Sequence, residues 1–214
     1  RVYGWMTLGL GVTAAIAWRV AQDPALVTSL ITNRGLFWTL IIAQFGAVIA
    51  LSGLINKINA ATATAIYLVY AALTGLTLSV IFFVYTSSSI AQVFGLTAFS
   101  FAGLSGFGYV TKRDLGPIGS FCIMGLFGMV GFSLLSMFFP SLMTGGTSFV
   151  FSIAGIVVFA GLTAYDTQRI KAMNVPGNAG SGEERKLAIH GALALYLDFV
   201  NLFLSLLRLT GRRR

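Results

Sequence analysis

The stretch ALALYLDFVNLFLSLLRL, from Ala192 to Leu209, places an acidic residue, Asp198, inside a mainly apolar run. A run of this length is sufficient to cross the hydrocarbon core of a bilayer as a helix. An Asp at such a depth costs roughly 2.5–3.5 kcal/mol on insertion scales, so it should face the interior of a helix bundle and have a partner there. The segment therefore predicts a membrane-spanning helix that carries a functional acid.

The composition of the whole chain supports a membrane protein. Of its 214 residues, 57% are hydrophobic and 9% are charged, whereas about 25% of residues are charged in soluble domains. The single Cys122 and the single His190 offer neither a disulfide framework nor a zinc site. Lys and Arg stand at the ends of apolar runs and not along one polar face, which argues against nucleic acid as a partner. We expect an integral membrane protein with no cofactor.

Apolar runs of about 20 residues recur along the chain and predict one all-α membrane domain over residues 1–214. Helices are expected instead of a β-barrel because the runs are continuously apolar and do not alternate. A longer polar segment at about 169–186, containing NVPGNAGSGEER, is expected to be a flexible cytoplasmic loop. The seven expected transmembrane helices cover about 2–21, 35–55, 62–85, 90–110, 117–139, 147–168 and 187–209.

The distribution of basic residues predicts an orientation. Basic residues occur in the second, fourth and sixth connections and are missing from the third and fifth, which places the amino terminus in the cytoplasm. A seventh crossing would put TGRRR, from Thr210 to Arg214, outside against this rule. We expect the last helix to cross because it is long enough, with a re-entrant helix as the alternative.

Small residues at intervals of four predict close helix packing within the membrane. In the first apolar run they favour a retained helix over a cleaved signal peptide, which the AIA sequence at Ala15–Ala17 would otherwise suggest. The three series are Gly9, Thr13 and Ala17; Ala71, Gly75 and Ser79; and Ala98, Ala102 and Gly106.

Asp166 and Asp198 are the only acids that fall within expected helices. Helical spacing puts Asp198 on a narrow stripe with Gly191, Ala194, Asn201, Ser205 and Arg208. If the two carboxyl groups meet, they should share one proton and titrate as a unit, because both cannot comfortably ionise at hydrogen-bonding distance. The alternative is that each acid separately satisfies a basic or hydroxyl side chain in a packing role.

The segments GLTAYDTQRIK (161–171) and GALALYLDFVNLFLSLLR (191–208) closely resemble the signature of the transmembrane Bax inhibitor motif family, also called Lifeguard. YAALTGLTLS (70–79) and YVTKRDL (109–115) extend the similarity, which is greatest to the bacterial inner-membrane branch. The resemblance implies seven helices with the last one central and surrounded by the other six. It also implies a pH-sensitive calcium leak governed by two aspartates, which match Asp166 and Asp198.

The resemblance further implies a basic gating residue at the end of the second helix, where this chain has Lys57. The family has Arg there, and Lys offers a flexible point charge in place of a planar fork, so a weaker latch is expected. An acid that some members carry in the second helix has no counterpart here, and Gln44 is the only polar side chain of comparable reach. Calcium selectivity is therefore less firmly implied than the acid pair.

The predicted function is a passive calcium or cation leak and not an enzyme. Asp166 and Asp198 would provide a transient Ca²⁺ site, with Lys57, Asn201 and Arg208 as gating or supporting residues. One alternative is a non-conducting modulator of a partner membrane protein, such as a protease or channel, contacted through the loop around residues 176–185. A less favoured alternative is a diaspartyl intramembrane protease, although YLDF lacks the glycines of the GxGD motif.

Overall fold

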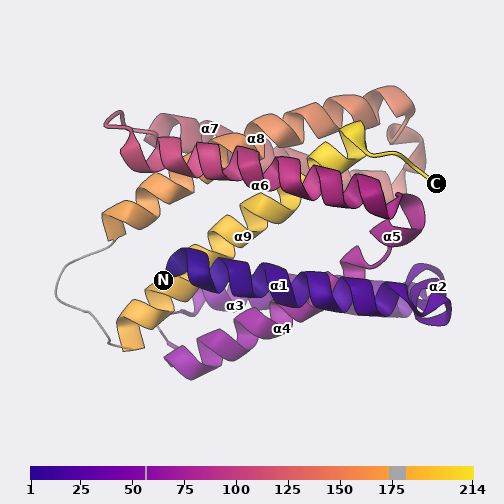
Figure 1. Cartoon of the computed structure of the whole chain (residues 1–214), viewed down its shortest axis with the longest axis horizontal. Coiled ribbons are helices and arrows are strands. Elements are labelled where there is room, and N and C mark those ends of the chain that lie inside the picture. The colour runs from indigo at the N-terminus through magenta and orange to yellow at the C-terminus, as the bar shows by residue number, and fades with distance from the viewer. Residues whose placement is uncertain (56, 174–181) are drawn as a thin grey trace. The chain divides into compact units, whose positions relative to one another are not determined.

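The computed structural model describes residues 1–55, 57–173 and 182–214, and within these ranges it is helical and has no β-strand. The chain divides into two compact units. The first contains α1–α5, the part of α9 up to Tyr196, and Arg213–Arg214; the second contains α6–α8 and the part of α9 from Leu197. The helices are α1 (Val2–Ala21), α2 (Pro24–Thr32), α3 (Arg34–Gly53), α4 (Ala60–Leu78), α5 (Ile81–Val84), α6 (Ser87–Val110), α7 (Gly116–Phe138), α8 (Gly145–Met173) and α9 (Gly182–Thr210), with a 3₁₀ turn at Pro140–Leu142 (Figure 1).

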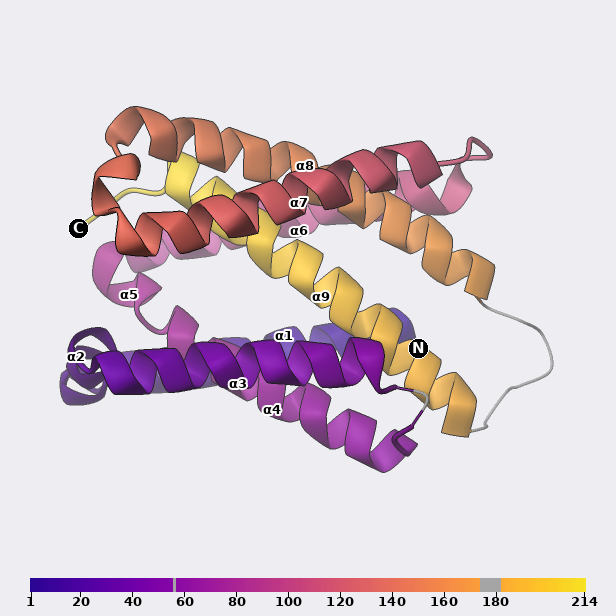
Figure 2. The same cartoon turned by 180° about the vertical axis from the view of Figure 1, so that it is seen from behind.

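In the first unit, α4 packs against both α1 and α3 (Figures 1 and 2). The small residues predicted to allow close packing are buried in α1, where Gly9, Thr13 and Ala17 are the buried positions together with Met6. A Cβ on Gly75 of α4 would lie 2.8 Å from the carbonyl oxygen of Thr13, so the two backbones approach as closely as glycine allows.

Buried hydroxyl groups join α1, α4 and α9 within this unit. Tyr196 of α9 is fully buried, and its hydroxyl lies 2.6 Å from Oγ1 of Thr13. Thr13 Oγ1 also lies 2.8 Å from the carbonyl oxygen of Ala71, to which it donates. The Tyr67 hydroxyl donates to the carbonyl oxygen of Trp5 at 2.9 Å, and the Tyr67 and Tyr196 rings meet edge to face. These contacts form the hydroxyl network, in which each named hydroxyl has a partner.

Two features of the first unit depart from the sequence prediction. Pro24–Thr32 forms the short helix α2 where a connection was expected, because Asp23 accepts hydrogen bonds from the Ala25 and Leu26 amides and Pro24 occupies the first turn. The expected helix over 62–85 is interrupted between α4 and α5. There the Ser79 hydroxyl donates to the carbonyl oxygen of Leu76 at 2.7 Å, a local bond that competes with the helix ladder.

In the second unit, α6 and α7 both pack against α8. Helix α8 continues to Met173 and α9 begins at Gly182, so both helices extend into the expected loop over 169–186, of which residues 174–181 lie outside the described residues. Lys171 in the last turn of α8 and Glu183 with Glu184 in the first turn of α9 suit the helix dipoles, which explains the extension.

The small-residue prediction for α6 is wrong. Ala98, Ala102 and Gly106 are exposed, whereas the buried positions of the helix include Thr97, Phe101, Ser105 and Gly108. The physical reason is that an aromatic ring, Phe101, occupies the helix contact, and only Gly108 makes a close backbone approach. A Cβ on Gly108 would overlap the carbonyl group of Ala164 in α8.

The exposed surface is that of a membrane protein. Phe99 is 82% exposed, Met124 74% and Phe127 72%, which is costly in water and favourable in lipid. Among the described residues, six helical segments are long and apolar enough to span a bilayer, α4 and α5 counting as one and α1 not included. Of these six segments, α9 has the largest share of buried residues in its most apolar stretch. Seven crossings and a central last helix remain predictions.

Candidate functional site

The second unit brings the two predicted acids together. Asp166 lies in the carboxyl-terminal part of α8, Asp198 lies in α9, and their side chains are joined by a hydrogen bond. Asp198 is 3% exposed and Asp166 is partly buried. A hydrogen bond between two carboxyl groups requires a proton on one of them. This arrangement, the acid pair, can form its hydrogen bond only while one of the two carboxyl groups is protonated.

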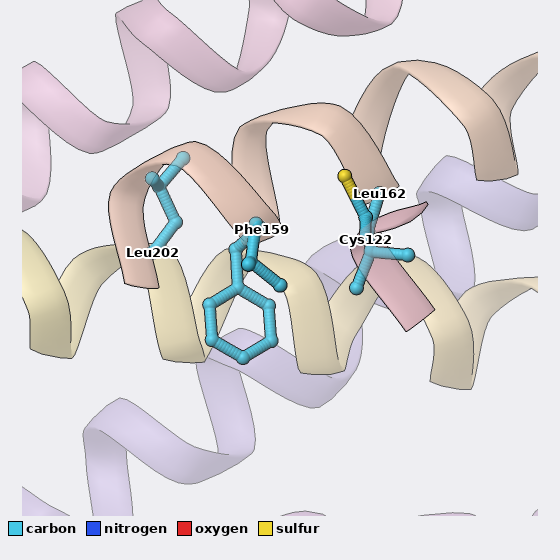
Figure 3. Close-up of a cluster of buried hydrophobic side chains, with 5 residues drawn as sticks. Cys122, Phe159, Leu162 and Leu202 are labelled. Atoms are coloured by element: carbon cyan, nitrogen blue, oxygen red, sulfur yellow. The ribbon is translucent and has the colours of Figure 1, made fainter. Parts of the chain in front are cut away.

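An apolar cluster lies one helical turn from the acid pair on both α8 and α9. Leu162 precedes Asp166 by one helical turn and Leu202 follows Asp198 by one turn, and both leucines are buried in the same cluster (Figure 3). The acids therefore occupy the next layer of the same helix contact. The other buried members of the cluster are Cys122 of α7 with Val158 and Phe159 of α8.

Helix α6 flanks the acid pair with two contacts. The Phe101 ring meets the ring of Phe199, the residue after Asp198, with a centroid separation of 5.4 Å. Two turns along the same helix, Gly108 contacts Ala164, two residues before Asp166. Both contacts place side chains and backbone of α6 beside the pair.

Two polar side chains after Asp166 tie the end of α8 to the connection between α6 and α7. Gln168 accepts a hydrogen bond from the Leu115 amide at 2.9 Å and donates one to the carbonyl oxygen of Arg113 at 2.8 Å. Lys171 Nζ donates to the carbonyl oxygen of Tyr109 at 2.7 Å and lies 4.6 Å from the centre of its ring. These contacts of Gln168 and Lys171 form the clamp. The sequence did not predict it, because Lys171 falls within the expected loop over 169–186.

Asn201 and Arg208, the other predicted site residues of the second unit, have partners outside the acid pair. The Asn201 amide donates to the carbonyl oxygen of Leu197 in its own helix at 2.8 Å. Arg208 is exposed, and its guanidinium lies 5.7 Å from the centre of the Phe151 ring. Lys57 is exposed and belongs to the first unit. Two members of the predicted polar stripe of α9 meet α8, because Ser205 lies against Gly155 and Asp198 bonds to Asp166.

Among the described residues, no group of three or more His, Cys, Asp or Glu side chains could hold a metal ion. A cation at the acid pair would therefore have two carboxyl groups, neutral oxygens and water as ligands.

The fold and the acid pair define the class: a helical integral membrane protein with a buried pair of carboxyl groups between two of its helices. The chain belongs to the family described as inhibitor of apoptosis-promoting Bax1, whose model matches residues 1–214, so the resemblance found in the sequence is confirmed.

Its relatives are bacterial proteins of similar length. The chain is 47% identical over 215 residues to the inner membrane protein YbhL of Escherichia coli K12, covering 100% of this chain and 91% of YbhL. It is 45% identical over 214 residues to an uncharacterized protein of Borreliella burgdorferi, with the same coverage of both chains. An uncharacterized protein of Deinococcus radiodurans is 39% identical over 213 residues, covering 100% of this chain and 89% of that protein.

Proposed function

We propose that this protein is a pH-sensitive leak channel for calcium or other cations, in which Asp166 and Asp198 form the proton sensor. The observation that carries the proposal is the hydrogen bond between the two carboxyl groups, with Asp198 almost completely buried. A shared proton at this place couples the charge of the site to the contact between α8 and α9. Buried ionisable residues in membrane helices are expensive to retain, which favours a functional role.

The mechanism follows from the charge of the pair. With the proton in place, the hydrogen bond holds α8 to α9 and the pair has a single negative charge at most. When the proton leaves, two carboxylates repel each other and offer anionic oxygens to a cation. Ca²⁺ prefers oxygen ligands, and the side-chain carbonyl of Asn201, one turn from Asp198, could add another. Cation flux should therefore increase as the pH rises.

The neighbours of the pair on α6 and α7 do not titrate in the pH range of carboxyl groups, so the proposed pH dependence is assigned to the proton of the pair. Helix α6 faces it with Phe101, Ser105 and Gly108, which do not titrate in the accessible range. Helix α7 contributes Cys122 of the neighbouring cluster, whose sulfur lies against Gly161 of α8. Neutral Cys has an ordinary pKa of about 8.5, above the range in which carboxyl groups usually titrate.

We further propose a location in the bacterial inner membrane, with seven crossings, a cytoplasmic amino terminus and α9 at the centre. The name of YbhL, an inner membrane protein, supports the location. The burial of α9 relative to the other spanning segments supports its central place. Helix α1 would supply the seventh crossing, since its 20 residues have the required length.

Calcium flux into liposomes tests the proposed function. Purified protein should pass Ca²⁺ faster at pH 8 than at pH 6, and Asp166→Asn or Asp198→Asn should remove this difference. Asp114→Asn is the matched control, because Asp114 is exposed and its carboxylate caps the Gly116 amide at 2.8 Å. Either buried variant with the pH dependence of the original protein would refute the sensor role.

The acid pair also fits the chemistry of a diaspartyl protease, in which one acid activates water and the other donates a proton. A labelled membrane-spanning substrate that stays intact with purified protein would eliminate this second function. Complete absence of flux in liposomes, together with altered activity of a co-reconstituted membrane protease or channel, would favour the modulator instead.

A further inference from the structure

Two buried oxygen atoms in the second unit lack a hydrogen-bond partner among the described residues: Oγ of Ser105 in α6 and Oδ2 of Asp198 in α9. Ser105 is 6% exposed and Asp198 is 3% exposed. Buried polar atoms in folded proteins almost always have a partner, and an ordered water or ion commonly supplies it. Two such atoms in one unit point to a polar ligand between them.

The contacts of α6 place Ser105 beside the acid pair. Phe101, one turn earlier on the same face, contacts the ring of Phe199 next to Asp198. Gly108, three residues later on that face, contacts Ala164 near Asp166. Leu104, the residue before Ser105, packs against the cluster that contains Leu202. Ser105 therefore lies between contacts that reach both helices of the pair.

We propose that Ser105 is the third member of this site, and that its hydroxyl and the free oxygen of Asp198 hold one water molecule between them. A water in this position has two polar partners that are otherwise unsatisfied, and buried waters in proteins make about two to four such hydrogen bonds. It would complete the hydrogen bonding of Asp198 and would be the first solvent molecule available when the pair loses its proton. The inference deepens the proposed function, because it names the group that connects the pair to water.

Infrared spectroscopy of the purified full chain tests the site directly. The carboxylic acid C=O stretching band of the pair is assigned by its loss in Asp166→Asn or Asp198→Asn. Ser105→Ala should move this band to higher wavenumber, because the carboxyl group loses a hydrogen bond. Ser105→Thr keeps a hydroxyl and should leave the band near its original position. A band that does not move in Ser105→Ala would overturn the proposal.

Thr97→Val is the matched control for a lost hydroxyl on the same face of α6. Thr97 is fully buried and its hydroxyl donates to the carbonyl oxygen of Val93 at 2.7 Å, so its removal should not affect the band. An equal shift in Thr97→Val would mean that the band reports packing and would also overturn the proposal.

Calcium flux separates this inference from the proposed function. In liposomes, Ser105→Ala should change the rate about two- to tenfold, as expected for the loss of one hydrogen bond. If the original protein passes no Ca²⁺ but the infrared shifts occur as described, the leak function fails and the water site stands. If flux is normal and the band is unaffected by Ser105→Ala, the leak function stands and the water site fails.

Discussion

The hydroxyl network of the first unit and the acid pair of the second are both polar groups buried among membrane helices, but they differ in how completely they are satisfied. In the network, the Thr13 and Tyr196 hydroxyls bond to each other and Thr13 also bonds to a backbone carbonyl. At the acid pair, one oxygen of Asp198 and the nearby Ser105 hydroxyl have no partner within the described part of the chain. A satisfied network stabilises one arrangement, whereas free polar atoms can respond to a proton, water or cation.

This comparison predicts two separate classes of variant. Substitutions in the first unit should lower stability and leave the pH dependence of flux unchanged. Substitutions around the acid pair should alter the pH dependence at little cost in stability.

Gly75→Ala should have the largest effect on stability. The new Cβ would lie 2.8 Å from the Thr13 carbonyl oxygen and 2.9 Å from Cβ of Ile16, so α1 and α4 must separate. A loss of about 1–3 kcal/mol is expected, measured by denaturant unfolding in detergent. Gly11→Ala, at an α1 position with no neighbour within 4 Å, should cause no loss. Equal stability of the two variants would show that α1 and α4 do not pack this closely.

Thr13→Val should have the next largest effect, because it keeps the shape of the side chain and removes the hydroxyl that lies 2.6 Å from the Tyr196 hydroxyl. The expected loss is about 1–2 kcal/mol in the same unfolding assay. Thr7→Val is the control, since Thr7 is exposed and bonds only within its own helix, to the Tyr3 carbonyl. The ratio of flux at pH 8 to flux at pH 6 should be the same for both variants. A changed ratio in Thr13→Val would contradict the expectation that substitutions in the first unit affect stability only.

Gln168→Leu should have a smaller effect on stability, about 0.5–1 kcal/mol, because one of the two lost hydrogen bonds is exposed to solvent. It should nevertheless shift the pH at half-maximal flux, since Gln168 holds the end of α8 two residues from Asp166. Gln92→Leu, an exposed position on α6, should leave this midpoint unchanged. A midpoint that is unaffected by Gln168→Leu would mean that the clamp does not position Asp166.

Lys57→Gln should have the smallest effect. Lys57 is exposed, and ion pairs of exposed residues are worth at most about 1 kcal/mol, so the flux should change by about fivefold or less. The pH dependence should persist. Its complete loss would assign to Lys57 a gating role equal to that of the acids.

The apolar runs predicted most of the helices, because membrane helices are long and continuously apolar. The sequence also identified Asp166 and Asp198, since an acid within such a run is rare and needs a partner. It did not identify Ser105 or Gln168, because hydroxyl and amide residues occur throughout the chain. Their role depends on which helix packs against them, and the sequence does not show this.

The orientation predicted from the basic residues stays a prediction, because the second unit carries basic residues at both of its ends. At one end, Lys171 lies near Tyr109 and the connection that carries Lys112 and Arg113. At the other end, Arg212 donates from its backbone amide to the Ser89 hydroxyl at the start of α6. Positive charge is present at both ends of this unit, so its distribution alone does not decide which end faces the cytoplasm.

The most direct test of the central claim is a double-variant cycle on the pH dependence of calcium flux with Asp166→Asn, Asp198→Asn and both together. If one proton is shared, either single variant removes the whole pH response and the double variant adds nothing further. Two partial effects that multiply in the double variant would mean that the acids titrate independently, and would contradict the account.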